Sequence, residues 1–181
     1  MVTPAPVDPD LVIRDGYTVT EPVTLSDLVN FHPASGVSHM EPGGWMIAGL
    51  DANFYASSST QVQTGELLGQ PATVRFTPAT FRWNYGDGTA ATLRTSGSTW
   101  AAQGKAEFQP TATSHVYRAA GTYAVDLTIN FAAEYRYTGA EWIPIAGTVP
   151  VAANQLTVTV GSAKTVLVGQ DCSASPAGPG C

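Results

Sequence analysis

The segment 121–131, GTYAVDLTINF, alternates between apolar residues at odd positions and small or polar residues at even positions. A period of two is typical of a β-strand that buries one face and exposes the other. The segment 80–86, TFRWNYG, repeats this period over a shorter length, with three aromatic residues on one face. Such strands need a second layer to cover their apolar face. We therefore expect layered β-sheets, with core residues Phe81, Trp83, Tyr85, Tyr123, Val125, Leu127, Ile129 and Phe131.

Further β-prone segments follow from residue 44 onward, separated by Gly, Pro, Asp and Ser. Turns that recur about every ten residues are typical of antiparallel sandwiches and barrels. Only 12% of the residues are charged, about half the usual share, which favours strands over exposed helices. The predicted strands are 44–50, 53–57, 60–68, 71–78, 80–86, 121–131 and 154–161, with a hairpin over 134–144.

One short helix is predicted in the segment 21–33, EPVTLSDLVNFHP. Thr24 and Ser26 can cap its N-terminus, Asp27 suits its first turn, and Pro33 ends it. We therefore expect an all-β protein with an N-terminal extension that carries this helix.

The charge pattern argues against two classes of partner. The net charge is −6, and the only lysines are Lys105 and Lys164. Nucleic acids and anionic membrane surfaces are not expected partners, because both attract clusters of basic side chains. No apolar run approaches the length of a membrane span, so membrane insertion is not expected either.

Two motifs occur in the order of a known family, WNYGDGT at 83–89 and SHVYRAAGTYAVDLTI at 114–129. Together they resemble the PKD domain, whose pattern joins a strand that ends in Gly-Asp-Gly with a downstream His-x-Tyr and Gly-Thr-Tyr. The sequence departs from the pattern at Asn84 and Tyr85, where Asp and Phe are usual, and in longer segments at 89–113 and after Ile129. The matching residues are Trp83, Gly86, Asp87, Gly88, His115, Tyr117, Gly121, Thr122 and Tyr123.

The resemblance covers roughly residues 62–161 and implies an immunoglobulin-like antiparallel β-sandwich. It also implies a secreted or cell-surface protein, contacts with proteins or polysaccharides or a spacer role, and no catalysis. We divide the chain into a Pro-rich leader (1–10), an extension that packs on the sandwich (11–61), the PKD-like sandwich (62–161) and a tail with a cysteine pair (162–181).

The two cysteines, Cys172 and Cys181, both lie in the tail, in CSASPAGPGC. Their spacing does not suit a zinc site, whose ligands usually come in pairs about two to four residues apart. A disulfide would close a short loop there and would indicate an oxidising compartment. We therefore predict a secreted or cell-surface protein whose signal peptide has been removed.

Asp87 lies between Gly86 and Gly88 at the end of a predicted strand. It can accept backbone N–H bonds in a turn, or it can be a calcium ligand or a catalytic carboxylate. Calcium needs several oxygen ligands close together, and only Asn84 is near. We favour the turn, together with a structural hydrogen bond for His115.

Other combinations of reactive residues match no strong template. His32, His39 and Glu41 fall in one loop-rich segment, without the spacing of a metal site. Glu134 and Glu141 flank a predicted hairpin and could form a glycosidase pair, but they fit its solvent face better. The chain has no Gly-x-Ser-x-Gly motif. We predict no catalytic residue, no metal and no cofactor.

Several aromatic residues lie outside the PKD pattern, among them Trp45, Trp100, Tyr135, Tyr137 and Trp142. Tyr135 and Tyr137 share one face of the predicted hairpin, and Trp142 begins its return strand. These three are candidates for an exposed strip that stacks on sugar rings or docks a partner. Alternatively they form a small core under the N-terminal extension, which we favour because residues 11–60 must pack against something.

The leading functional hypothesis is a non-catalytic extracellular module for binding, adhesion or spacing, whose partner is a surface protein or a cell-envelope polysaccharide. The second is a structural subunit that self-assembles into a surface layer or filament, its extension completing a neighbour's sheet. A third, a small secreted hydrolase, lacks a convincing catalytic constellation.

Overall fold

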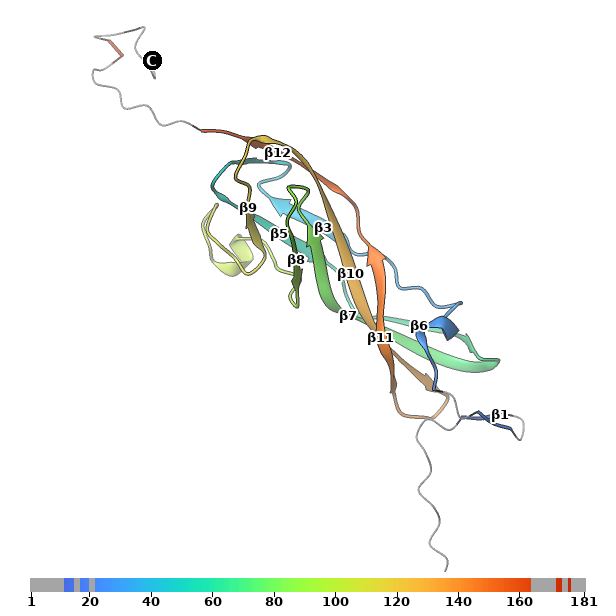
Figure 1. The fold of residues 1–181 in the computed structure, drawn as a ribbon. Helices are drawn as coiled ribbons and strands as arrows, with labels where there is room; N and C mark the ends of the chain where they lie inside the picture. The colour runs from blue at the N-terminus through green and yellow to red at the C-terminus, as the bar shows by residue number, and fades with distance from the viewer. Residues whose placement is uncertain (1–11, 15–16, 20–21, 164–171, 174–175, 177–181) are drawn as a thin grey trace, which may run out of the picture.

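The structure, a computed structural model, describes residues 12–14, 17–19, 22–163, 172–173 and 176 (Figure 1). Within these residues the regular structure is almost entirely β-strand, and both helices are short 3₁₀ turns. The elements are β1 (Val12–Arg14), β2 (Tyr17–Val19), η1 (Leu25–Asp27), β3 (Val37–Glu41), β4 (Trp45–Ile47), β5 (Asp51–Ser57), β6 (Gln61–Leu67), β7 (Gln70–Asn84), β8 (Ala90–Leu93), η2 (Ala101–Gln103), β9 (Ser114–Val116), β10 (Gly121–Tyr137), β11 (Ile143–Ala152) and β12 (Leu156–Gly161).

Two long antiparallel strands, β7 and β10, run along the length of the molecule (Figure 1). They pair from Asn84 and Asp126 at one end to Ala72 and Tyr137 at the other. Every other residue of β10 from Val125 onward is buried, as the alternation of the sequence predicts. This pair is the structural axis on which the other strands assemble.

The sequence predicted β7 as two strands with a break near Pro78, and this was wrong. The structure joins them into one strand of 15 residues. A register shift between Asn130 and Phe131 of β10 lies opposite the proline. Proline cannot donate a ladder hydrogen bond, and a β-bulge is one of the few places where a paired strand accepts it.

The large sheet has two consecutive sections that share β7 and β10. In the upper section of Figure 1, β12 pairs with β10, β8 pairs with β7, and β4 pairs with β12 in parallel. In the lower section, β11 pairs with the remainder of β10, and β6 pairs with the remainder of β7. We use the names upper and lower section below.

A second sheet, ordered β3-β5-β9, covers the upper section. Phe54 of β5 packs against Trp83 and Tyr85 of the large sheet, at ring-centroid distances of 5.5 and 5.3 Å. Two sheets that bury their apolar faces against each other make an antiparallel β-sandwich. The predicted all-β, immunoglobulin-like sandwich is confirmed.

The N-terminal segment 22–34 covers the inner face of the lower section. Its residues Val23, Leu28 and Phe31 are buried in the core. The short helix predicted here is the 3₁₀ turn η1, where Asp27 Oδ2 accepts a hydrogen bond of 2.8 Å from the backbone N–H of Thr24. The facing residues of the sheet are also buried: Leu67, Ala72, Val74, Phe76, Phe131, Ala133, Tyr135 and Ile145.

Two glutamines of β6 fix the position of this segment. Gln61 accepts a hydrogen bond from the N–H of Ala34 (2.7 Å) and donates one to its carbonyl (3.0 Å). Gln63 makes the same pair of bonds with His32, at 3.2 and 2.6 Å. Each side-chain amide thus pairs with a backbone peptide as a neighbouring strand would. The segment is held in register along β6 without being a strand itself.

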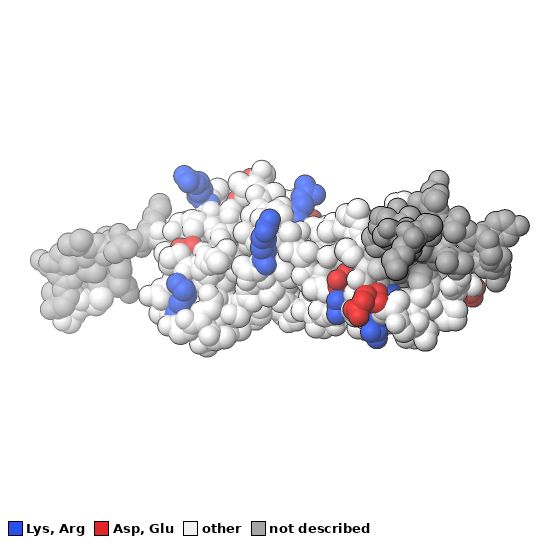
Figure 2. Space-filling view, turned by 90° about the horizontal axis from the view of Figure 1, so that it is seen from below, with Lys and Arg blue, Asp and Glu red and all other residues white. Residues whose placement is uncertain are grey.

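The surface carries few charges. Figure 2 shows scattered Lys, Arg, Asp and Glu side chains on a face that is otherwise uncharged. Of the helices that the structure describes, none is long and apolar enough to cross a membrane.

Candidate functional site

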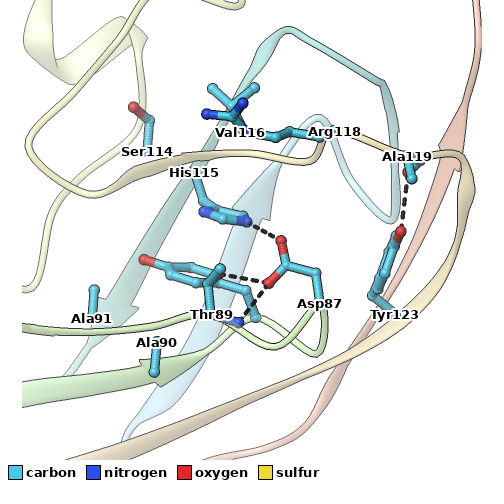
Figure 3. Close-up of a pocket in the computed structure, with 11 residues that line it drawn as sticks. Asp87, Thr89, Ala90, Ala91, Ser114, His115, Val116, Arg118, Ala119 and Tyr123 are labelled. Atoms are coloured by element: carbon cyan, nitrogen blue, oxygen red, sulfur yellow. Dashed lines mark hydrogen bonds and ion pairs between the residues drawn. The ribbon is translucent and has the colours of Figure 1, made fainter.

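The β7–β8 turn presents the carboxylate that the sequence singled out (Figure 3). Asp87 Oδ1 accepts hydrogen bonds from the backbone N–H of Thr89 (3.0 Å) and from its hydroxyl (2.5 Å). Gly86, with φ +78°, lies so close to the next strand that a Cβ there would be 2.4 Å from the carbonyl oxygen of Ala124. The turn is therefore built for glycine at this position, and Asp87 closes it as an Asx turn does.

The second oxygen of Asp87 meets His115 of β9. Its Oδ2 lies 2.8 Å from His115 Nε2, and the two side chains are 16% and 15% exposed. This contact joins the large sheet to the small one. Burial would raise the pKa of the Asp87 carboxyl, but the hydrogen bonds from Thr89 and His115 outweigh burial and lower this pKa below its ordinary value.

Aromatic rings surround this pair. His115 stacks on Tyr85, with ring centroids 4.0 Å apart and planes 4° from parallel, and meets Tyr117 edge-on at 4.6 Å. The Tyr117 hydroxyl donates to the carbonyl of Tyr85 (2.9 Å), and the Tyr123 hydroxyl donates to that of Ala119 (3.0 Å). Both tyrosines of the motif thus bond the backbone. Burial and the nearby Asp87 charge raise the pKa of Tyr85 to about 12.

The pair lies on the wall of an open hollow of about 620 Å³. Ser114, the serine of this wall, lies away from the pair and donates its hydroxyl to Asp51 Oδ1 (2.6 Å), not to His115 (Figure 3). Both oxygens of Asp87 already have partners. This arrangement suits a structural contact between the two sheets better than acid–base chemistry. We call the bonded pair Asp87 and His115 the clasp. The wall consists of Tyr85, Asp87, Thr89, Ala90, Ala91, Ser114, His115, Val116, Arg118, Ala119 and Tyr123.

The remaining motif residues lie around the clasp. Trp83 is fully buried in the sandwich core. Gly88 has φ +89° and open space around it. Gly121 begins β10, and a Cβ there would be 3.3 Å from the Tyr123 hydroxyl. The positions picked out by the sequence thus assemble at one end of the upper section.

The exposed aromatic strip does not form, and this is a correction. Tyr135 is 2% exposed, because it lies on the inner face of the lower section under the N-terminal segment. Tyr137 packs partly buried against the same core. Trp142 is half-buried, with the guanidinium carbons of Arg75 and Arg136 at 4.3 and 4.5 Å from its ring centroid. The alternative interpretation, a core beneath the extension, describes Tyr135 and Tyr137.

Glu134 and Glu141, which the sequence offered as a glycosidase pair, differ in their partners and exposure. Glu134 forms an ion pair with Arg75 at 2.7 Å, with both side chains about a third exposed. Glu141 is exposed on the β10–β11 hairpin. Glu134 is already neutralised by its partner, which does not favour a role as a general acid.

His32, His39 and Glu41 are not brought together. His32 is held through its backbone by Gln63, and His39 stacks on Tyr55 with ring centroids 5.0 Å apart. Among the described residues, no group of three His, Cys, Asp or Glu side chains is placed to hold a metal ion.

Glu41 instead belongs to a buried polar network that the sequence analysis missed. Asn53 of β5 is fully buried, and its amide donates to Glu41 Oε2 (2.9 Å) and to the Ser98 carbonyl (2.8 Å). Its Oδ1 accepts from the Thr111 hydroxyl (2.8 Å). Glu41 Oε2 also accepts from the backbone N–H of Trp100 (2.7 Å). The network anchors the long 89–113 insert to the small sheet.

The remaining predictions concern the ends of the chain. The Pro-rich leader (1–10), most of the tail (162–181) and Cys181 lie outside the described residues. The disulfide between Cys172 and Cys181 therefore stays a prediction.

Comparison with known proteins agrees with the geometry of the clasp. Residues 51–134 match the family model of the PKD domain. No curated protein and no solved structure matches the chain. The matched segment runs from β5 through most of β10, so it includes a strand that the sequence analysis placed in the extension. It contains Trp83, the Gly-Asp-Gly turn, His115 and the two bonded tyrosines, so the resemblance to the PKD domain is confirmed for this part of the chain.

Proposed function

We propose that this chain is a non-catalytic extracellular module that binds a surface protein or a cell-envelope polysaccharide and holds it at a distance as a stiff spacer. The observation that carries the proposal is the β7–β10 pair, which continues through both sections of the sheet with one register shift, between Asn130 and Phe131. PKD domains occur in extracellular proteins and commonly serve adhesion or spacing, and this supports the assignment.

The strand order supports the spacer role. β12 pairs with the first residues of β10, at Gly121 to Val125, and its last residue lies at the top of the upper section in Figure 1. The segment after residue 22 begins at the opposite end, beside the lower section. Hydrogen bonds between antiparallel strands lie perpendicular to the strands. A force that pulls these two ends apart along the strands would therefore load many interstrand hydrogen bonds at once, in shear. The module would resist such extension.

The clasp supports a non-catalytic role. Asp87 is bonded to both Thr89 and His115, and its contact with His115 joins the two sheets. The burial of the pair between stacked rings favours fixed geometry. Activity on a broad panel of glycosides, esters and peptides would contradict this part of the proposal.

The test has two arms. In the first, the oxidised protein is incubated with cell-envelope preparations, and retention is measured against a PKD-free control protein of similar charge. In the second, the chain is held between handles at residues 22 and 161 and pulled in a single-molecule force experiment. We expect saturable retention, and unfolding in one high-force event. Absence of retention together with low-force, stepwise extension would overturn the proposal.

One observation favours self-assembly as a second candidate. Strand β6 pairs only with β7 among the described strands, and Val62 on it is 58% exposed. Residues 32–34 bond only the side chains of Gln61 and Gln63 on this strand, and an edge strand without a strand partner can accept a strand from another copy. Light scattering after size exclusion measures this directly: a monomer at high protein concentration would count against assembly.

A further inference from the structure

Among the described aromatic side chains, the most exposed lies far along the chain from the predicted strip. Trp45 of β4 is 50% exposed, and its ring meets that of Phe108 edge-on with centroids 6.3 Å apart. Phe108 also packs against Trp100, at 5.8 Å, and Trp100 is only 4% exposed. We call the two outer rings, Trp45 and Phe108, the aromatic platform; Trp100 is the buried ring behind it.

The strand fixes the orientation of Trp45. Its backbone lies between two hydrogen bonds to β12, from Thr159 N–H to the Gly44 carbonyl (2.9 Å) and from Ala48 N–H to the Gly161 carbonyl (2.8 Å). The next residue, Met46, points inward and is 1% exposed. Because side chains alternate along a strand, Trp45 must point outward. Its exposure is built into β4 and does not depend on a mobile loop.

The backbone of Phe108 is unusual. Its φ is +61°, in the left-handed region that favours glycine. The surrounding loop is closed by hydrogen bonds from Trp100 Nε1 to the Gln109 carbonyl (2.9 Å) and from Lys105 Nζ to the Pro110 carbonyl (2.6 Å). A large aromatic residue in such a conformation is strained, and strained residues concentrate at binding and catalytic sites. Glycine or asparagine would adopt this backbone conformation with less strain.

We propose that the aromatic platform binds the pyranose rings of a neutral polysaccharide. The C–H bonds on one face of a sugar ring carry partial positive charge and stack on the negative face of an aromatic ring. The exposed neighbours of Phe108 in sequence, Glu107 and Gln109, offer a carboxylate and an amide to sugar hydroxyls. The chain's net charge of −6 disfavours anionic glycans, which leaves neutral ones.

This inference rests on the proposed binding role and names the site and the class of ligand. Neither ring belongs to the residues that carry the PKD motif, and Phe108 lies in the 89–113 insert. The site is thus a feature of this chain added at one edge of the sandwich. The opposite, lower section carries the exposed Val62 and provides a matched control.

The first experiment measures depletion of the full chain by insoluble cellulose, chitin, β-1,3-glucan and starch. The variants are Trp45→Ala and Phe108→Asn, with Val62→Ala as the exposed apolar control. We expect saturable binding to at least one polymer and a loss of about tenfold or more in affinity for both platform variants. The control should bind as the wild type does. Asparagine tolerates a positive φ, so Phe108→Asn should keep the fold, as thermal unfolding will verify.

A second readout keeps the test independent of folding. A soluble oligosaccharide of the polymer that is bound should shift the tryptophan emission of the wild type. In Trp45→Phe, which keeps a ring at the site, binding by depletion should persist while the emission shift disappears, because Trp83 and Trp100 are buried and Trp142 lies away from the platform, against Arg75 and Arg136 of the lower section.

Two results would overturn the inference. One is equal binding by the wild type and a folded Trp45→Ala variant. The other is binding to none of the four polymers. If the protein is nevertheless retained by cell-envelope preparations, the sugar site is wrong and the proposed binding role stands. If it is retained by neither, the binding role fails as well.

Discussion

Asp87 of the β7–β8 turn and His115 of β9 meet at 2.8 Å and connect the two sheets of the sandwich. The carboxylate has a lowered pKa, so its ionised form is stabilised by folding. Asp87→Ala should reduce the free energy of unfolding at pH 7 by about 2–3 kcal/mol, through lost charge-assisted hydrogen bonds. Urea denaturation measures this value. The control is Asp126→Ala, which removes an exposed carboxylate from the neighbouring strand β10.

The same pair gives a pH dependence with a definite sign. A carboxyl whose pKa is lower in the folded than in the unfolded chain contributes stability above its ordinary value of 3.8 and loses it as the pH falls through the lowered pKa. The difference between wild type and Asp87→Ala should therefore shrink in acid. A difference that stays constant from pH 7 to pH 3 would show that the carboxylate charge is not what stabilises the clasp.

Gly86 and Gly88 flank Asp87, and substitutions at the two positions distinguish backbone strain from steric overlap. Both have positive φ, but a Cβ at Gly86 would meet the Ala124 carbonyl at 2.4 Å, whereas one at Gly88 meets nothing within 4 Å. Gly88→Ala should cost about 1–2 kcal/mol from backbone strain alone. Gly86→Ala should cost more than about 3 kcal/mol because backbone must also move. Equal losses in thermal or urea unfolding would refute the steric argument.

Gly65 of β6 lies under the ring of Phe31, and a Cβ there would be 3.0 Å from two ring carbons. Gly65→Leu should displace the N-terminal segment and cost about 1–3 kcal/mol through overpacking. Hydrogen exchange of residues 22–34 should rise, while that of the upper section should not. Gly43→Ala, which has open space, is the control. Replacing Phe31 by Leu in the Gly65→Leu background should recover part of the loss, because the smaller side chain makes room for the added one.

The upper section was predictable because its signals are local. The alternation of β10 places Val125, Leu127, Ile129 and Phe131 in the core, where the structure has them. The Gly-Asp-Gly turn follows from two glycines and a short acceptor side chain. Such patterns depend on backbone sterics and strand period, which act within a few residues.

The lower section was predicted less well because its determinants are non-local. Gln61 and Gln63 look like solvent-facing residues of an edge strand, yet they pair with the backbone of residues 32–34. Pro78 looks like a strand end, but the strand continues through a bulge beside it, where Ala79 is the extra residue between the pairs Pro78–Phe131 and Thr80–Asn130. Trp45 gave no sign of its exposure, because Phe108 meets it only through the fold of the insert.

The tail carries a prediction that rests on sequence. Cys172 and Cys181 should form a disulfide in protein recovered from its native compartment. Intact mass after alkylation without reduction should show neither cysteine modified. Two alkylated cysteines would remove this argument for an oxidising compartment, and a reduced and alkylated sample is the control.

Asn53 makes the central hydrogen bonds that hold the 89–113 insert against the small sheet. It is fully buried and bonds Glu41, the Ser98 carbonyl and Thr111. Asn53→Ala leaves a carboxylate, a carbonyl and a hydroxyl without this partner, and each buried group left unpaired costs about 1–3 kcal/mol. The insert can reduce that cost by opening to water, so we expect local loosening more than global unfolding.

Hydrogen exchange separates the two outcomes for Asn53→Ala. Protection should fall over residues 94–113 and change little in β7 and β10. The emission of Trp100, which is 4% exposed and bonded to Gln109, should shift to the red as the insert opens. Thr99→Ala is the control, because its hydroxyl accepts only a local bond from Ala102. Uniform loss of protection across the sandwich would mean that Asn53 stabilises the whole fold, and that the insert is not a separately opening unit.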